Sequence, residues 1–481
     1  MPVSASYQAR PVHTKLGTGF YDAVRPAQFP QRTLRFKNQR WAERVGLGAL
    51  SDAEWESHFA WFVPLPANLE RPLALRYHGH QFDQYNPALG DGRGFLFAQL
   101  ELDADLVSGS TGKLLDLGTK GSGTTPWSRA GDGRLTLKGG VREVLATEML
   151  EALGVDTSKS FALFETGEKL SRGDEPSPTR SSVLTRLSHS NIRIGTFQRF
   201  AYEENTAALQ KLVDHVIEHL FPWLANEADR PAALARETVR RVARQGAAYG
   251  AAGFVHGVLN SDNINITGES FDYGPYRFLP TYDPTFTAAY FDHGGLYCFG
   301  RQPIALKKNL QRLCDSLRLI APNVAWGTIV NGFDESYGEA LARNIVARLG
   351  LRSFGADEDS LLAETAFTFL KASKIGFDRF FFDWYAGSAS EERALGGPHR
   401  KAYESADFAQ LRRLLDAFEP RCGTVLSTPY FQREAPVTLL YDVIEEIWQD
   451  IAARDDWTAF DRQIEETRIW GSTQGCAGGE R

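Results

Sequence analysis

The sequence is poor in sulfur and has no excess of positive charge. Its 481 residues include four cysteines and two methionines, and no two cysteines have the CxxC spacing of a metal or redox pair. Scattered cysteines favour a reducing compartment, so we expect a cytoplasmic protein. The 53 Lys and Arg residues are outnumbered by 60 Asp and Glu, which gives a formal charge of −7. This balance argues against a general nucleic-acid binder, because few cations are free to neutralise phosphates.

Long apolar runs are missing too. No segment reaches the roughly 18 apolar residues that a membrane helix needs, and the N-terminus has no apolar core of the signal-peptide type. We therefore predict no membrane partner. Internal repeats and long low-complexity segments are also absent. The hydrophobic content of 43% is that of an ordinary globular protein.

The pattern of apolar residues changes along the chain and predicts an α+β protein with four regions. Residues 1–75 show little periodicity apart from one short helix near 52–62, and we expect them to form a wrapping arm. Residues 76–202 alternate Gly-rich turns with short apolar runs, which predicts a sheet with one helix. Residues 203–465 have helical periodicity, and residues 466–481 form a flexible tail. In the second region we expect strands at Phe95–Leu100, Leu114–Thr119, Phe161–Thr166 and Ser182–Leu187, and a helix at Val141–Leu153.

The strongest motif lies between His256 and Gly274. It contains Asn263 and, nine residues later, the triplet Asp272-Tyr273-Gly274. An Asn followed at this distance by Asp-aromatic-Gly is similar to the metal-binding pair of kinase-like folds. Magnesium prefers hard oxygen ligands and bridges nucleotide phosphates, and we expect the two side chains on neighbouring short strands. The alternative is a pair of ordinary turns that bind no metal.

One departure from the kinase pattern concerns the catalytic base. Protein kinases carry an Asp five residues before the metal-binding Asn, but this position is Val258 here, and valine cannot accept a proton. Asp262, directly before Asn263, is the nearest replacement. The segment therefore predicts a kinase-like scaffold with changed chemistry.

A second set of residues lies upstream, in Gly-rich turns. Gly90-Asp91-Gly92-Arg93 precedes one expected strand, Lys120 follows another, and Gly131-Asp132-Gly133-Arg134 comes next. Glycine lets the backbone approach phosphates, and Lys and Arg supply positive charge. Each turn alone would most simply be a hairpin turn, but the three together favour a nucleotide-binding site.

Lys120 needs an acidic partner if it serves in a kinase-type ion pair. Two acids on the following helix compete for this role. Glu148 lies on the apolar face of the helix, so periodicity favours it, whereas Glu143 lies off that face. Farther along, Arg186 and Arg193 flank a turn and suit bidentate binding of phosphate oxygens. Surface salt bridges would also explain these two arginines.

Together these motifs resemble the selenoprotein O family of kinase-like protein adenylyltransferases. The similarity spans about residues 75–303 and weakens after about residue 310, where we expect a divergent segment. The resemblance implies a bilobal protein-kinase-like fold that binds ATP in a reversed orientation and transfers AMP to Ser, Thr or Tyr hydroxyls of proteins. The similar stretches are GHQFDQYNPALGDGRG, KGSGTTPWSRAGDGR with VREVLATE, LTRLSHSNIRIGTFQRF, and HGVLNSDNINI with DYGPYRFL.

The resemblance also implies roles for individual residues. Glu143 matches the family's ion-pair glutamate, which outweighs the periodicity that favours Glu148. Asp262 would accept the proton, and Asn263 and Asp272 would bind Mg²⁺, with Mn²⁺ as the alternative. ATP and hydroxyl-bearing proteins would be the partners. The sequence does not fix the oligomeric state and is compatible with a monomer. The nucleotide would be held by Gly90, Gly92, Arg93, Lys120, Asp132, Gly133, Glu143, Arg186, Arg193 and Asp272.

Two other functions stay open: a phosphotransferase, and a non-catalytic nucleotide-binding pseudokinase that acts as a scaffold. Val258 argues against the first, and the presence of all three catalytic and metal-binding candidates argues against the second. Family members often carry a selenocysteine or cysteine near the C-terminus, which some pair with a cysteine in the activation-type loop. Here Cys476 is single and Ala288 stands at the loop position, so we do not expect a redox pair.

Overall fold

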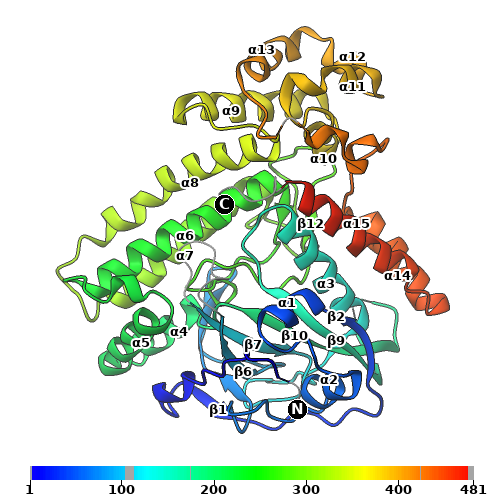
Figure 1. The fold of residues 1–481 in the computed structure, drawn as a ribbon. Helices are drawn as coiled ribbons and strands as arrows, with labels where there is room; N and C mark the ends of the chain where they lie inside the picture. The colour runs from blue at the N-terminus through cyan, green and yellow to red at the C-terminus, as the bar shows by residue number, and fades with distance from the viewer. Residues whose placement is uncertain (1–2, 103–112, 174, 423, 475–481) are drawn as a thin grey trace.

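The computed structural model describes residues 3–102, 113–173, 175–422 and 424–474. It is a mixed α+β structure, as the sequence predicts, with an antiparallel sheet in the N-terminal part and mainly helices in the C-terminal part. Figure 1 shows the sheet at the bottom of the view, with the long helices crossing above it. Loops of the region between about residues 255 and 300 lie where these two parts meet.

The large antiparallel sheet has the strand order β1-β3-β6-β7-β10-β9-β2, and β8 pairs with β10. Its central strand β7 is buried along its whole length, because β6 and β10 flank it and its side chains enter the hydrophobic cores on both faces of the sheet. The strands are β1 (Tyr21–Ala23), β2 (Thr33–Lys37), β3 (Leu73–Leu75), β6 (Leu96–Glu101), β7 (Leu114–Lys120), β8 (Leu135–Thr136), β9 (Lys159–Leu170) and β10 (Thr179–Ser188). Two small two-stranded sheets pair β4 (Gly79–Gln81) with β5 (Gln84–Asn86), as a hairpin, and β11 (Phe254–Val255) with β12 (Arg277–Phe278).

Helices cover both faces of the sheet. On one face, α1 (Gln39–Arg44) and α2 (Asp52–Phe59) bury an aromatic cluster that includes Trp55, Phe59 and Phe161. On the other, α3 (Leu137–Ala152) begins at Thr136, whose side chain accepts from Gly139 N–H, and packs on β9 and β10. Residues 1–75 thus contain more regular structure than the one short helix that we expected, because β1, β2 and β3 extend the sheet.

The C-terminal part is helical. Helices α6 and α8 pack along each other, and α9–α13 form a cap at the top of Figure 1. Helices α14 and α15 return to α3, where Arg468 binds Glu148 with two hydrogen bonds of 2.7 Å. No described helix combines the length and apolar character of a membrane span. The helices are α4 (Ile194–Tyr202), α5 (Thr206–His219), α6 (Arg230–Ala252), α7 (Gln302–Leu317), α8 (Trp326–Arg348), α9 (Ala356–Ser373), α10 (Phe377–Asp383), α11 (Glu391–Gly396), α12 (Arg400–Tyr403), α13 (Ala409–Ala417), α14 (Tyr441–Arg454) and α15 (Thr458–Gln474).

Candidate functional site

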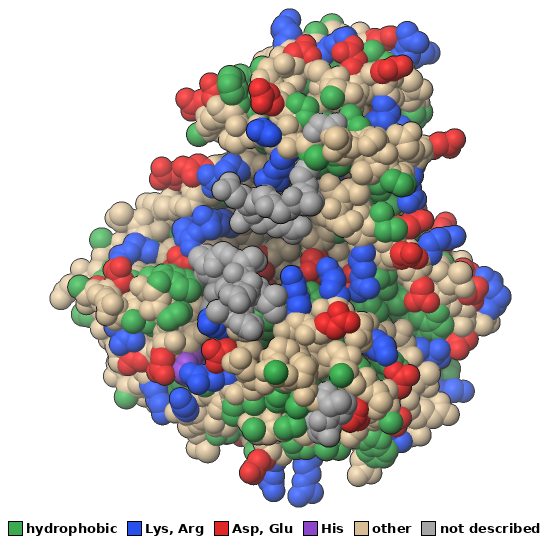
Figure 2. All heavy atoms as spheres, viewed as in Figure 1, with side chains coloured by type: hydrophobic (Ala, Val, Ile, Leu, Met, Phe, Trp, Pro, Cys, Tyr) green, Lys and Arg blue, Asp and Glu red, His purple; other side chains and the backbone are tan. Residues whose placement is uncertain are grey.

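A polar cleft of about 610 Å³ lies between the Gly-rich turns of the sheet and the loops that follow α6. Lys and Arg side chains gather around the middle of the face that Figure 2 shows. Ten of the twelve residues to which the family resemblance gives a role line this cleft; Glu143 and Asn263 are the two that do not. The ten are Gly90, Gly92, Arg93, Lys120, Asp132, Gly133, Arg186, Arg193, Asp262 and Asp272.

The floor of the cleft is a network of four charged residues, Lys120, Glu143, Arg186 and Asp272, which we call the floor network. Lys120, at the end of β7, forms a short ion pair with Glu143 of α3 and contacts Asp272 Oδ1 at 2.8 Å. Arg186 of β10 donates to the same Oδ1 at 3.0 Å. Glu148, which periodicity favoured, binds Arg468 of α15 instead.

The electrostatics of the floor network hold Asp272 ionised. Burial alone would raise the pKa of Asp272, but the positive charges of Lys120, Arg186 and Arg93 outweigh it and hold the pKa well below its usual range. The backbone of Asp272 is left-handed, with φ of 66°, an uncommon conformation for a residue other than glycine. This angle belongs to the turn that brings the carboxylate into the cleft.

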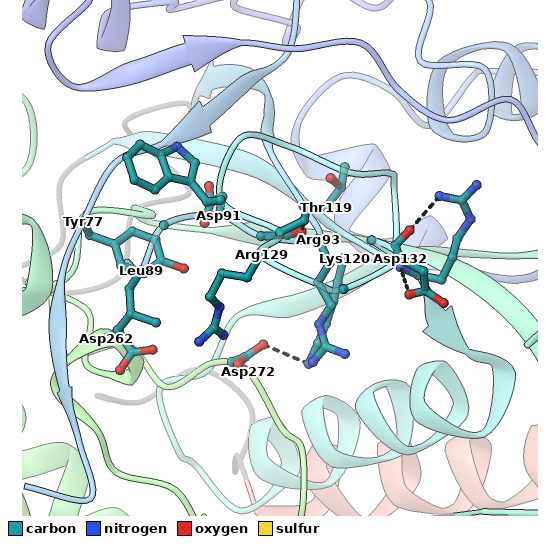
Figure 3. Close-up of a pocket in the computed structure, with 18 of the residues that line it drawn as sticks. Tyr77, Leu89, Asp91, Arg93, Thr119, Lys120, Arg129, Asp132, Asp262 and Asp272 are labelled. Carbon is teal, nitrogen blue, oxygen red and sulfur yellow. Dashed lines mark hydrogen bonds and ion pairs between the residues drawn. The ribbon is translucent and has the colours of Figure 1, made fainter. Parts of the chain in front are cut away.

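Asp262 lies across the cleft from the floor network (Figure 3). It belongs to the 3-10 turn η4 (Ser261–Asn263), and only 8% of its surface is exposed. Gln81 Nε2 lies 3.5 Å from its Oδ2, while Oδ1 is buried with no hydrogen-bond partner among the described residues. Burial, only partly offset by Arg193, raises the pKa of Asp262 to about 6. A buried carboxylate oxygen without a partner can accept a proton from a bound ligand.

Asn263 does not lie on the short strand that we expected beside Asp272, so that expectation was wrong. Ile264 O accepts from Ile194 N–H and Ile266 N–H donates to Ile192 O, both at 3.0 Å. The buried isoleucines thus pair this segment with residues 192–194 and not with the segment of Asp272. Asn263 donates its side-chain N–H to Val258 O at 3.0 Å.

The Gly-rich turns form the roof of the cleft, and their glycines are required by close packing. A Cβ at Gly90 would lie 2.4 Å from the ring of Trp127. Gly133 has φ of 70°, and a Cβ there would lie 2.3 Å from the carbonyl group of Gly123. The Trp127 indole N–H donates to Asp22 of β1 at 2.9 Å. The N-terminal strand therefore helps to position the roof.

The arginines around the cleft differ in whether they form ion pairs. Arg134 binds Glu168, and Arg172 binds Asp132, both at 2.8 Å. Arg93 and Arg129 form no ion pair with any described carboxylate. Figure 3 shows the Arg129 side chain pointing toward the gap between Asp262 and Asp272. Its φ of 55° is left-handed, so its backbone is held in a rare conformation.

Arg193 joins the roof to the loop of Asp262. Its guanidinium contacts Asp91 Oδ1 at 3.1 Å and donates to Asp262 O at 2.9 Å. The group also lies over the rings of Tyr77 and Phe271, at 4.4 and 4.9 Å from their centres. Burial would lower the pKa of Arg193, but Tyr77, Asp91 and the other nearby acids raise it above its usual range. Arg193 is therefore a fixed charge at the wall of the cleft.

Sequence reasoning missed several cleft residues. Arg129 stands in a Gly-rich stretch between Lys120 and Asp132, and its charge in that setting was the available signal. Gln81 and Tyr77 had no comparable signal, because their positions depend on how the β4–β5 hairpin folds back on the loop of Asp262.

A second group of possible metal ligands lies away from the cleft, at the end of β10. Ligand atoms of Asp156, His189 and Glu269 lie within 4.8 Å of one another. His189 donates its backbone N–H to Glu269 at 2.8 Å, and its Nδ1 lies 2.9 Å from the same carboxylate. Burial would lower the pKa of His189, but Glu269 outweighs it and raises the pKa. The contacts between His189 and Glu269 connect the end of β10 to the loop at 265–270. A histidine with two carboxylates would also suit a divalent cation.

The cysteines add no redox pair within the described residues. Cys298, Cys314 and Cys422 are free thiols, and Cys476 lies outside the described part of the chain.

Comparisons with known proteins cover nearly the whole chain. A family model described as "Protein adenylyltransferase SelO" matches residues 3–468. Relatives named "Protein nucleotidyltransferase YdiU" include that of Trichormus variabilis, 42% identical over 464 residues, which cover 94% of this chain and 93% of the relative. The relative in Gloeobacter violaceus is 43% identical over 461 residues, which cover 94% and 92%. The relative in Synechocystis sp. is 43% identical over 474 residues, which cover 95% and 97%.

These matches correct one expectation. The segment after residue 310 is not where the similarity ends, because the family match continues to residue 468. Helical amphipathic sequences change freely as long as the apolar stripe is kept, so motif inspection alone had little to match there. The chain therefore belongs to the SelO family, and with its YdiU relatives it is a nucleotidyltransferase.

Proposed function

We propose that this chain is a protein adenylyltransferase that transfers AMP from ATP to Ser, Thr or Tyr hydroxyls of proteins. The observation that carries the proposal is the unpartnered, buried Oδ1 of Asp262 at the wall of a cleft rich in Lys and Arg. A carboxylate oxygen without a partner suits proton acceptance, and clustered cations suit a polyphosphate. The family description is of a protein adenylyltransferase, which agrees with both.

In the proposed reaction the acceptor hydroxyl gives its proton to Asp262 Oδ1 as its oxygen attacks the α-phosphorus of ATP. The bond from the α-phosphorus to the bridging oxygen breaks, and pyrophosphate leaves with that electron pair. Arg193 and Gln81 position Asp262. Arg193 donates to the backbone carbonyl of Asp262, and the side-chain amide of Gln81 contacts Oδ2. Nothing further is needed for the proton balance, because one proton moves from the hydroxyl to the carboxylate.

The cations of the cleft would bind the phosphates. Lys120 and Arg186 are aimed by their contacts with Asp272, while Arg93 and Arg129 approach from the roof without a carboxylate partner of their own among the described residues. Fixed positive groups stabilise the charge that develops in the transition state, because they need no reorganisation. Gly90, Gly92, Asp132 and Gly133 would shape the turn that covers the nucleotide.

Mg²⁺, with Mn²⁺ as the alternative, would use one oxygen atom of Asp272 on the floor and one of Asn263, the neighbour of Asp262 in the chain. Lys120 and Arg186 both contact Oδ1 of Asp272, so Oδ2 keeps its lone pairs for another ligand. Asn263 uses its amide N–H on Val258, which leaves its Oδ1 as a hard ligand. When bound there, the metal would offset negative charge on the phosphate oxygens.

The same proposal includes a bilobal kinase-like arrangement. Protein kinases use a strand lysine paired with a helix glutamate, together with a metal-binding Asn and, farther along the chain, an Asp-aromatic-Gly triplet. This chain has the same set of parts, in Lys120, Glu143, Asn263 and Asp272-Tyr273-Gly274. We propose residues 76–202 as the nucleotide-binding lobe and 203–465 as the helical lobe. Residues 1–75 would be an arm that supports the first lobe, and 466–481 a tail.

ATP labelled at either the α- or the γ-phosphate tests the proposal. Incubation with a protein acceptor and Mg²⁺ should transfer the α-label alone and release pyrophosphate. Transfer of the γ-label alone would make the chain a phosphotransferase, and transfer of neither label, with ATP still bound, would make it a scaffold. Omission of the divalent metal should abolish transfer, which tests the metal requirement in the same assay.

A further inference from the structure

The β4–β5 hairpin carries an exposed aromatic side chain at its turn. Phe82 and Asp83 form this turn, and both have left-handed backbones, with φ of 47° and 65°. Such angles are unfavourable for residues with a side chain, and for a bulky one they are true outliers. Phe82 is 37% exposed, so burial of its ring does not explain the conformation. The surrounding contacts must impose it.

Two sets of contacts hold the turn. Phe82 N–H donates to Asn260 Oδ1 at 3.1 Å, in the loop that carries the candidate proton acceptor. The Asp83 carboxylate binds Lys308 and Arg312 of α7 at 2.6 and 2.8 Å. The hairpin is therefore attached at once to the candidate catalytic loop and to the helical part.

The same asparagine also holds the loop between residues 283 and 301. Tyr297 donates its hydroxyl to Asn260 Oδ1 at 2.6 Å. Asp292 accepts two backbone N–H groups of this loop, both at 2.8 Å, which fixes its turn. The ring of Phe82 packs on Tyr297 and Phe291, with centroids 5.2 and 5.8 Å apart. Hairpin and loop thus present one continuous surface.

Three aromatic side chains of that surface face solvent. Phe82, Tyr290 and Phe291, which we call the aromatic platform, are 37%, 73% and 42% exposed. Tyr290 and Phe291 pack edge to face, 5.1 Å apart. Contiguous exposed aromatic groups on a rigid base are typical of binding surfaces.

The platform begins at the wall of the cleft. Gln81, the neighbour of Phe82 in the chain, lies 3.5 Å from Asp262 Oδ2, and Gln81 and Asp262 both line the cleft. Tyr290 and Phe291 line an adjoining pocket that shares Arg93 and Lys120 with the cleft. The residues that flank a hydroxyl bound at Asp262 can reach this surface, because an extended chain advances about 3.3–3.6 Å per residue.

We propose that the aromatic platform docks the substrate segment that flanks the acceptor hydroxyl and selects apolar side chains there. This inference rests on the proposed function, because it names how the acceptor protein is recognised. The occupant follows from the surface, because the exposed parts of aromatic rings gain most from contact with apolar partners. Phe82 is the centre of the platform because it touches both the candidate catalytic loop and Phe291.

Two synthetic peptides test the inference. Each carries one serine, and they differ only in the flanking residues, which are Leu and Phe in one peptide and Gln in the other. With α-labelled ATP, the unchanged protein should have a kcat/KM about tenfold or more higher for the apolar peptide. Phe82→Ala should remove most of this preference through KM. Phe82→Leu, which keeps an apolar surface, should retain it.

Controls separate docking from chemistry. Release of AMP from ATP to water in the absence of peptide should be the same in Phe82→Ala and in the unchanged protein. Phe354→Ala removes another exposed ring, which is 63% exposed and lies two residues before α9, and this variant should keep the preference. Equal transfer to both peptides by the unchanged protein, or equal losses for both in Phe82→Ala, would overturn the inference. Absence of any α-label transfer would overturn the proposed function itself.

Discussion

The floor and the roof of the cleft use positive charge in opposite ways. On the floor, Lys120 and Arg186 contact Asp272, and Lys120 also binds the buried Glu143. In the roof, Arg93 and Arg129 line the cleft without an ion-pair partner among the described carboxylates. The floor charges position one another, whereas the roof charges are positioned by the backbone of Gly-rich turns.

This difference predicts different consequences of substitution. A floor residue holds a buried partner, so its loss leaves an uncompensated charge and lowers stability as well as activity. Arg93 and Arg129 have no such partner among the described residues, so the loss of either should reduce activity and leave stability unchanged. Asp262 stands between the two regions and should affect chemistry alone.

Asp262→Asn should have the largest effect. An amide cannot take the proton of the acceptor, so AMP transfer should fall about a thousandfold, while ATP affinity changes little because the cations of floor and roof remain. Transfer of the α-label measures activity, and calorimetric titration with ATP measures affinity. Asp315→Asn, on the exposed side of α7, is the matched control. Loss of ATP binding in Asp262→Asn would instead assign this residue to the nucleotide site.

Lys120→Met should have the next largest effect, and it tests whether the floor network also stabilises the fold. Glu143 and Asp272 would lose their shared cation, and the free energy of unfolding in urea should fall by about 3–5 kcal/mol. AMP transfer should be lost as well. Adding Glu143→Gln to Lys120→Met should restore part of the stability but no activity. Unchanged stability in Lys120→Met would remove the distinction between floor and roof.

Arg129→Gly tests the roof, with a smaller effect. AMP transfer should fall about a hundredfold because one fixed positive group is lost. Stability should stay the same or rise, because glycine adopts the φ of 55° without penalty. Lys374→Gly removes a charge at the same φ of 55°, after the end of α9, and should leave transfer unchanged. A destabilised Arg129→Gly would mean that the roof cation also has a structural partner.

The last comparison concerns buried histidines outside the cleft, where stability responds to pH and AMP transfer should be unaffected. Burial lowers the pKa of His13 to about 4 and that of His215 to about 2, from about 6.5 in the unfolded chain. Below pH 6.5 the proton therefore binds only the unfolded chain. The free energy of unfolding should fall as pH decreases from 6.5 toward 4, by about 1.4 kcal/mol per pH unit for each histidine.

A comparison of slopes checks this expectation. His215→Gln should reduce the dependence of unfolding free energy on pH by about one histidine's share, and His293→Gln, at an exposed position, should not. Equal slopes in the unchanged protein and in His215→Gln would contradict the neutral state of His215.

Local sequence was informative wherever short-range patterns decide the structure. The strands β6, β7, β9 and β10 and the helix α3 lie where apolar runs and turns predict them, although β9 ends four residues later and α3 begins four residues earlier than expected. The acid that pairs with Lys120 was harder to predict, because α3 is enclosed on nearly all sides and both Glu143 and Glu148 are buried. Periodicity identifies a buried face, but it does not say which neighbour a buried acid meets.

Long-range packing decided what local patterns could not. Gly90 looked like a phosphate-binding glycine, and the structure adds a second reason for it, since the Trp127 ring leaves no room for a Cβ. The strands of residues 1–75 were missed because each is three to five residues long and is stabilised by partners distant in the chain, such as β9 for β2.

By itself the sequence determined the composition of the site: Lys120 after a strand, Asp262 beside Asn263, and a Gly-rich stretch with arginines. Only the tertiary structure decided how these residues meet, with Glu143 rather than Glu148 against Lys120, and Arg129 directed toward the gap beside Asp262. The physical reason is that side-chain chemistry is local, whereas burial and charge pairing depend on contacts between segments far apart in the chain. The preference for one partner over another is therefore visible only after the sheet and the helices have packed.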